Sequence, residues 1–367
     1  MSNQNGLRDP LSPLAKPFIW IGDFWLKLSA PLQVSLIFLL LIAKNGFDVE
    51  LKNVQEAYLP GSLIFPDPAG YFSASFGQVI FANVFHLTNT PLWILGHSLL
   101  SVGAILLASI LVIRNFPANR SHMLLVLAAA TSTSAVLLSI GKYDVFTFLG
   151  GALLVLARSN WVAIIGAVLL ASGNPEQAIL ASCALLLLSF TGDFRSMRAR
   201  STIAFAVSVT VWIAVQVWFA SAGLDQGRLS LVRTFLGDSI SNVIADPLGV
   251  IWSWLGVGWV IVAVAIIVML PKQRYVALAS VIAIPAIASI ITADGARVFG
   301  AVVFPSFLIL GNWLSSKKIQ QSTFAVPAVG IFIVLFALLP NGIDRPGWLE
   351  GQIRGKVMSV TEQFTQP

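Results

Sequence analysis

Three short turns between long apolar stretches carry charged side chains of the types that bind anions or transfer protons. The turns are residues 141–144 (Gly-Lys-Tyr-Asp), 174–177 (Asn-Pro-Glu-Gln) and 292–297 (Thr-Ala-Asp-Gly-Ala-Arg). A charge at a membrane boundary costs desolvation energy unless it finds a partner or a ligand. Carboxylates such as Asp144 can act as general bases, and the guanidinium of Arg297 suits a phosphate or pyrophosphate group. These turns therefore indicate anion binding and proton transfer.

Each turn also has a purely structural interpretation. Lys142 can neutralise Asp144, so that neither side chain needs a ligand. Glu176 belongs to the first turn of the segment that follows it, where the helix dipole favours an anion. Asp294 and Arg297 have the i,i+3 spacing of an ion pair on one helix. The sequence leaves these interpretations open beside the functional ones.

A long polar stretch, residues 44–91, adds further carboxylates near its start and an apolar part with helical character at 71–85. Loops of this length are typically functional, often as lids, and the alternative is a solvated cap over the bundle. A second loop, at 222–247, adds more arginine. The candidate catalytic residues are Asp48, Glu50 and Asp144. The candidate substrate-binding residues are Lys142, Tyr143, Glu176, Arg228, Asp294 and Arg297.

The sequence lacks the motifs of several common catalytic and binding sites. No Ser/His/Asp pattern, glycine-rich phosphate loop or paired-cysteine site occurs, and the single cysteine is Cys183. The three histidines have no metal-ligand spacing, so we expect no metal site, and the sequence leaves the cofactor undetermined. The net charge of +6 does not indicate nucleic acid, because no basic run exceeds Lys317-Lys318 and loop bias in a membrane protein explains the excess.

The elements that must position these side chains are transmembrane helices. The chain is 57% hydrophobic and 10% charged, whereas a soluble domain carries about 25% charged residues. Apolar runs near the ~20 residues that span a bilayer recur throughout, and only helices satisfy their backbone internally there. About eleven segments are predicted: 29–43, 92–113, 123–140, 145–157, 161–172, 178–190, 202–221, 248–270, 275–291, 298–313 and 323–339.

The fold class predicted is therefore an all-α polytopic transmembrane helix bundle. It has nine to eleven crossings, because 161–190 can also be a hairpin that never fully crosses. An amphipathic stretch at 18–27 suits the membrane interface. Residues 1–28 form the cytoplasmic tail and interfacial helix, 29–340 the bundle with its outer loop at 44–91, and 341–367 an outer tail.

The charge distribution orients this bundle. An N-terminus inside and a C-terminus outside places 13 of 22 basic residues in short inner connections, as the positive-inside rule requires. The same orientation places 13 of 16 acidic residues outside. Because acidic residues do not determine topology, their asymmetry is separate information. It predicts that the polar chemistry takes place at the outer face.

Asp48 and Glu50 after an early helix, isolated acids in later outer turns and Arg297 at the outer boundary resemble the polytopic GT-C glycosyltransferases. The turns 141–144, 174–177 and 294–297 also resemble uncharacterised bacterial membrane proteins of polysaccharide clusters. The resemblance implies a transferase of the cytoplasmic (inner) membrane, working in cell-surface polysaccharide or glycolipid assembly. It also implies a polyprenyl-phosphate sugar donor and a principal acid just after the first helix, at Asp48 or Glu50.

The partners expected are this donor, membrane lipids and other membrane proteins, with no nucleic acid among them. Two other functions stay open: a lipid or sugar transporter (flippase) and a non-catalytic membrane scaffold. Transport predicts charges at mid-depth on broken helices. Scaffolding predicts charges that are scattered, exposed to lipid or paired with one another.

Overall fold

The computed structural model describes residues 12–49, 74–221, 223, 228–292, 294–316 and 325–339. Within these ranges the chain is helical, with no strand beyond one isolated bridge between Val49 and Ile140. The helices are α1 (Ser12–Lys27), α2 (Ala30–Asn45), α4 (Phe76–Val84), α5 (Thr90–Asn115), α6 (Arg120–Ala129), α7 (Thr131–Leu138), α8 (Asp144–Leu156), α9 (Asn160–Gly173), α10 (Pro175–Leu188), η2 (Gly192–Met197), α11 (Arg198–Ser221), α12 (Arg228–Ala245), α13 (Pro247–Leu255), α14 (Gly258–Val268), α15 (Pro271–Leu278), η3 (Ala279–Ala283), α16 (Ile284–Ile290), α17 (Gly295–Ser316) and α18 (Ala325–Leu338). Each predicted apolar segment is thus occupied by helix.

The chain is an all-helical membrane protein with four to six candidate spans in its described part. Four helical stretches are long and apolar enough to cross by themselves: α5, η2 with α11, α15 to α16, and α17. Two bent pairs raise the number to six: α6 with α7, at 56°, and α13 with α14, at 87°. Eleven crossings, the orientation and an outer position for the loop 44–91 stay predictions.

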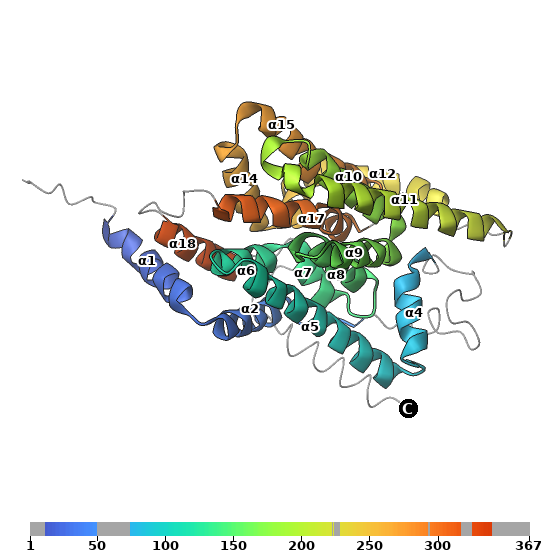
Figure 1. The fold of residues 1–367 in the computed structure, drawn as a ribbon, viewed down its shortest axis with the longest axis horizontal. Helices are drawn as coiled ribbons and strands as arrows, with labels where there is room; N and C mark the ends of the chain where they lie inside the picture. Colours follow the sequence, from blue (N-terminus) through green and yellow to red (C-terminus); the bar gives the residue numbers. More distant parts are fainter. Residues whose placement is uncertain are drawn as a thin grey trace, which may run out of the picture.

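Helix α17 is the central element of the bundle. It lies between the α14–α15 region and the α6–α9 region (Figure 1). In its most apolar stretch of 18 residues, 89% of the residues are buried. Its aromatic side chains stack on neighbours from both sides: Phe299 on Trp254 at 4.6 Å and Phe304 on Phe148 at 4.9 Å between ring centroids. The start of α17 is therefore held in a defined position by the core.

Helices α8 and α9 form a tight antiparallel hairpin built on two glycines. A Cβ at Gly150 would lie 2.3 Å from the backbone nitrogen of Leu170, and one at Gly166 would lie 2.6 Å from that of Leu154. Small residues permit such backbone approach between membrane helices, where dispersion and weak hydrogen bonds replace the hydrophobic effect. The contact buries α8 almost completely and sets the position of its first residue.

Replacement of Gly150 by alanine is expected to destabilise this hairpin. The added methyl group meets backbone atoms that cannot move aside, so overpacking should cost about 1–3 kcal/mol. Gly103→Ala is the matched control, because that helical glycine has nothing within 4 Å of the added Cβ and alanine is the better helix former. The measurement is the thermal unfolding midpoint in nanodiscs. Equal midpoints for the two variants would contradict the packing described.

Candidate functional site

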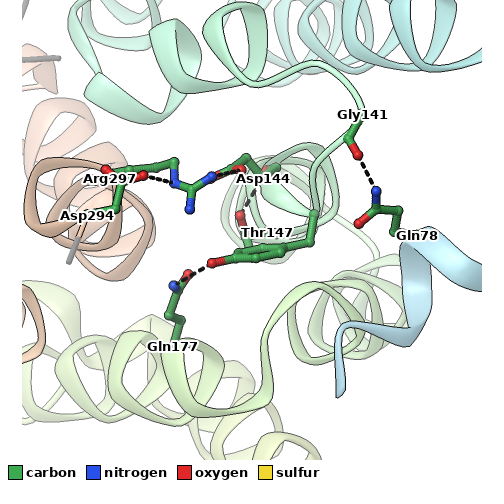
Figure 2. Close-up of polar contacts among 8 residues, drawn as sticks. Gln78, Gly141, Asp144, Thr147, Gln177, Asp294 and Arg297 are labelled. Atoms are coloured by element: carbon green, nitrogen blue, oxygen red, sulfur yellow. Dashed lines mark hydrogen bonds and ion pairs between the residues drawn. The ribbon is translucent and has the colours of Figure 1, made fainter. Parts of the chain in front are cut away.

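Two of the predicted turns meet across the bundle through a buried ion pair. Arg297, in the first turn of α17, donates from Nη1 to Oδ2 of Asp144, the first residue of α8, over 3.1 Å (Figure 2). The side chain of Asp144 is 4% exposed and that of Arg297 is 13% exposed. A hydrogen-bonded pair of this kind keeps two charges stable where either alone would be costly. The pair joins residues that lie 153 positions apart.

Arg297 also has a local partner and an aromatic neighbour. Its Nε lies 2.9 Å from Oδ2 of Asp294, which confirms the i,i+3 ion pair expected from the sequence. Asp294 is 49% exposed, so this second carboxylate faces water far more than Asp144 does. The guanidinium carbon lies 5.4 Å from the centre of the Tyr143 ring, within the range of a cation–π contact. Arg297 is thereby held on three sides.

The third predicted turn reaches this cluster through Tyr143. Asn174 caps α10 by accepting a hydrogen bond from the Gln177 backbone nitrogen at 3.1 Å. The amide of Gln177 then reaches the Tyr143 hydroxyl at 3.4 Å (Figure 2). Glu176 is half-buried in the same first turn of α10, as its capping interpretation predicts. The turns at 141–144, 174–177 and 294–297 therefore lie together.

The chain after α2 arrives at the same end of the bundle. The backbone nitrogen of Asp48 donates to the Leu137 carbonyl at 3.0 Å, and the nitrogen of Ile140 donates to the Asp48 carbonyl at 2.9 Å. These bonds attach Asp48, whose side chain is half-buried, to the residues that lead into the 141–144 turn. Glu50 lies outside the described residues, as does the side chain of Arg228.

Helix α4 covers the turn at 141–144. The Gln78 side-chain amide donates to the carbonyl of Gly141 (Figure 2). A Cβ at Gly77 would lie 2.6 Å from Oγ of Ser172. Gly141 has φ of 90°, a conformation that glycine adopts without steric cost. Within the apolar part of the 44–91 loop predicted at 71–85, residues Phe76–Val84 are a helix, and this helix packs on the site.

Three helix N-termini converge here, those of α8, α10 and α17. Each carries a partial positive charge of about half an elementary charge, which favours anions. The protein's own carboxylates occupy part of this field, since Asp144 and Glu176 stand in the first turns of their helices. An incoming phosphate group would meet the same field, and it could displace Asp294, the most exposed carboxylate, from Arg297.

Other polar groups shape the site without having been predicted. Gln78 and Gln177 are buried amides whose oxygens have no hydrogen-bond partner among the described residues. Thr147 donates to the Asp144 carbonyl at 2.8 Å and secures the first turn of α8. The signal in the sequence is, for Gln78, an amide inside a largely apolar stretch and, for Gln177, its position in the predicted turn 174–177. In the part of the chain that the structure describes, no group of three or more His, Cys, Asp or Glu could hold a metal ion.

The pairing of Asp144 with Arg297 is expected to be strongly coupled. Arg297→Ala leaves a buried carboxylate without its partner, which should cost about 3–5 kcal/mol of unfolding free energy. The double variant Asp144→Ala/Arg297→Ala should lose less than the sum of the single variants, because no charge is stranded. Asp294→Ala is the control, with an expected cost of under about 1 kcal/mol for an exposed pair. Additive losses in unfolding experiments would contradict the pair.

Comparisons of the chain with protein-family models, with curated proteins and with solved structures gave no match. The geometry of the cluster and the sequence are therefore the basis for assigning a function.

Proposed function

We propose that the chain is a membrane glycosyltransferase that takes a sugar from a polyprenyl-phosphate donor. The reaction would take place at the membrane interface where α8, α10 and α17 begin, on the outer face of the cytoplasmic membrane, in surface polysaccharide or glycolipid assembly. The observation that carries the proposal is Arg297, held by Asp144 and Asp294 at the meeting point of three helix N-termini.

A lipid-linked phosphate fits this arrangement on chemical grounds. A guanidinium presents several N–H donors in a planar fork that matches phosphate oxygens. Helix N-termini add backbone dipoles of the sign that stabilises negative charge. Lys142, half-buried in the adjacent turn, adds a second cation. A donor carried by a lipid also needs no nucleotide pocket, in keeping with the lack of a glycine-rich phosphate loop in the sequence.

The proposed reaction is a single displacement at the anomeric carbon. An acceptor hydroxyl forms the new glycosidic bond while the bond from the anomeric carbon to the phosphate oxygen breaks. The hydroxyl proton passes to a carboxylate, and the lipid phosphate leaves with the electron pair. Arg297 stabilises the negative charge that develops on that phosphate.

The solvent exposure of Asp294 and Asp144 indicates which of the two carboxylates can act as the general base. A general base must reach the acceptor hydroxyl, and Asp294 is 49% exposed whereas Asp144 is 4% exposed. We therefore assign Asp144 a positioning role toward Arg297. Asp294 is the proposed base among the described residues near Arg297. Asp48 and Glu50, the positions favoured by the resemblance, remain the alternative bases.

Transport is the second candidate, and one observation favours it. The breaks of the two bent helix pairs touch, since Oγ1 of Thr131 donates to the carbonyl of Trp254 at 2.8 Å. Discontinuous helices often mark the substrate sites of transporters. The breaks at 129–134 and 254–258, however, contain no charged residue, and the ion pair lies at the helix ends. Charge placement therefore favours transfer chemistry at an interface.

A transfer assay tests the proposal directly. Purified protein in nanodiscs is incubated with a panel of polyprenyl-phosphate sugars and candidate acceptors, and the released lipid phosphate and the glycosylated product are quantified. Arg297→Ala should lower turnover by about 10²- to 10³-fold, the effect of removing one charge-stabilising group. Arg297→Lys, which keeps the charge and loses the fork, should lie between.

Arg274 provides the matched control. This arginine caps α14 through bonds to the Met269 and Ile267 carbonyls, both at 2.8 Å, so Arg274→Ala removes a structural guanidinium away from the site. Its turnover should stay near that of the parent protein. An Arg297→Ala variant whose turnover equals that of the parent protein would overturn the site assignment. Movement of the lipid across a liposome membrane without sugar transfer would favour the transporter.

A further inference from the structure

A polar cavity lies beside the first turn of α17, next to the ion-pair cluster. It has a volume of about 400 Å³, is open on one side and is bordered by α12, α13, the end of α16 and the start of α17. Its polar lining comes from Ser239, Asn242, Asp246, Ser253, Trp254 and Ser289. Volumes of about 300–1,000 Å³ are typical of small-molecule sites. Asp144, Asp294 and Arg297 are not among its lining residues.

The described residues of the lining suit a neutral ligand with many hydroxyl groups. Among them are no lysine, arginine or histidine, and Asp246 is the one acidic residue. Serine hydroxyls, the Asn242 amide and a carboxylate offer both donors and acceptors, as a hydroxyl group requires. A phosphate would find no cation among these described residues, whereas the neighbouring Arg297 offers one.

Trp254 carries an unsatisfied hydrogen-bond donor. The residue is 7% exposed, and its Nε1 is buried without a hydrogen-bond partner in the described part of the chain. A buried donor left unpaired costs about 1–3 kcal/mol, so native structures seldom keep one without a reason. Trp254 lines the cavity, and a small rotation of its indole toward an oxygen of a bound ligand would pair this donor. Trp254 is therefore the side chain most diagnostic of occupancy.

The walls of the cavity are already held in place. Trp254 stacks on Phe299 with an interplanar angle of 8°, and Asp246 caps α13 by accepting from the Gly249 nitrogen at 2.9 Å. Ser239 donates to the Thr292 carbonyl at 2.9 Å, which ties α12 to the turn before Asp294. Binding to such a preformed site costs little ordering entropy.

The cavity and the ion-pair cluster share one turn of chain. Gly295 and Ala296 line the cavity, and they lie between Asp294 and Arg297 in the sequence. We propose that this cavity binds the acceptor of the transfer reaction, as a neutral sugar or glycoside. The role of the bound saccharide as acceptor rests on the proposed function, whereas the binding of a neutral saccharide does not. The cavity and the cluster would then hold the two substrates on either side of this turn.

Binding is tested separately from transfer. Protein in nanodiscs, free of sugar-based detergents that would compete, is titrated with methyl glycosides of common neutral hexoses and N-acetylhexosamines by calorimetry. Trp254→Phe keeps the stacking on Phe299 and removes the indole N–H, and Asn242→Ala removes an exposed amide. Each should raise the Kd about three- to tenfold, the effect of losing one hydrogen bond.

Trp259→Phe is the matched control. This indole also contacts Phe299, but its Nε1 donates to the Ile251 carbonyl at 2.7 Å and the residue does not line the cavity. Its Kd should equal that of the parent protein. The proposal is overturned if no neutral glycoside binds, or if the cavity variants bind as tightly as the parent protein does.

Arg297→Ala separates this inference from the proposed function. The variant should leave glycoside affinity within about twofold while it lowers sugar transfer by about 10²- to 10³-fold. Glycoside binding that responds to Trp254→Phe, in a protein that transfers no sugar, would support the cavity and refute the transferase. Transfer that needs Arg297, with an acceptor KM unchanged in both cavity variants, would refute the cavity alone.

Discussion

The ion pair between Asp144 and Arg297 is the interaction on which the arrangement of this protein depends. Two charges removed from water lose several kcal/mol of solvation each, and only close geometry with further polar contacts recovers that loss. The helix N-termini, Asp294 and the Tyr143 ring supply those contacts here. The pair therefore requires α8 and α17 to begin at the same place, and the surrounding helices are packed so that they do.

The helices around this ion pair are too short to cross a bilayer by themselves. Helices α8, α9 and α10 contain 13 or 14 residues, or about 20 Å at 1.5 Å per residue, against a hydrocarbon thickness of about 30 Å. Their ends can carry polar turns at membrane depth only where protein surrounds them. Close glycine contacts in the α8–α9 hairpin and the α4 helix over the 141–144 turn provide that cover.

The described helices separate two kinds of polar chemistry. Charged groups gather where α8, α10 and α17 begin, whereas hydroxyl groups gather at the break between α6 and α7, where Thr131, Ser132, Thr133 and Ser134 are all buried. Charges suit the recognition and departure of a phosphate, and uncharged groups suit helix bending and neutral ligands. A transferase at an interface uses the first kind directly. The second kind gives the bent helices their internal hydrogen bonds, such as that from Thr133 to the Leu127 carbonyl at 2.5 Å.

The sequence by itself determined the membrane setting, the positions of the helices and the three charged turns, because these follow from apolar length and local charge. It also predicted the i,i+3 pair of Asp294 and Arg297, since helical spacing alone brings them together. It did not predict the break at Gly256, where φ is 51°, because 248–270 has continuous hydropathy. Nor did it predict that the amides of Gln78 and Gln177 are buried, because burial of a polar side chain depends on packing and not on the chain around it.

Only the tertiary structure decided that Arg297 pairs with Asp144. The sequence offered Lys142, two residues away, and the guanidinium that donates to Asp144 lies 153 positions later. Ion pairing depends on distance in space and on the loss of water from both partners. Helix packing determines both the distance between the two side chains and their loss of water, and neither can be inferred from hydropathy along the chain.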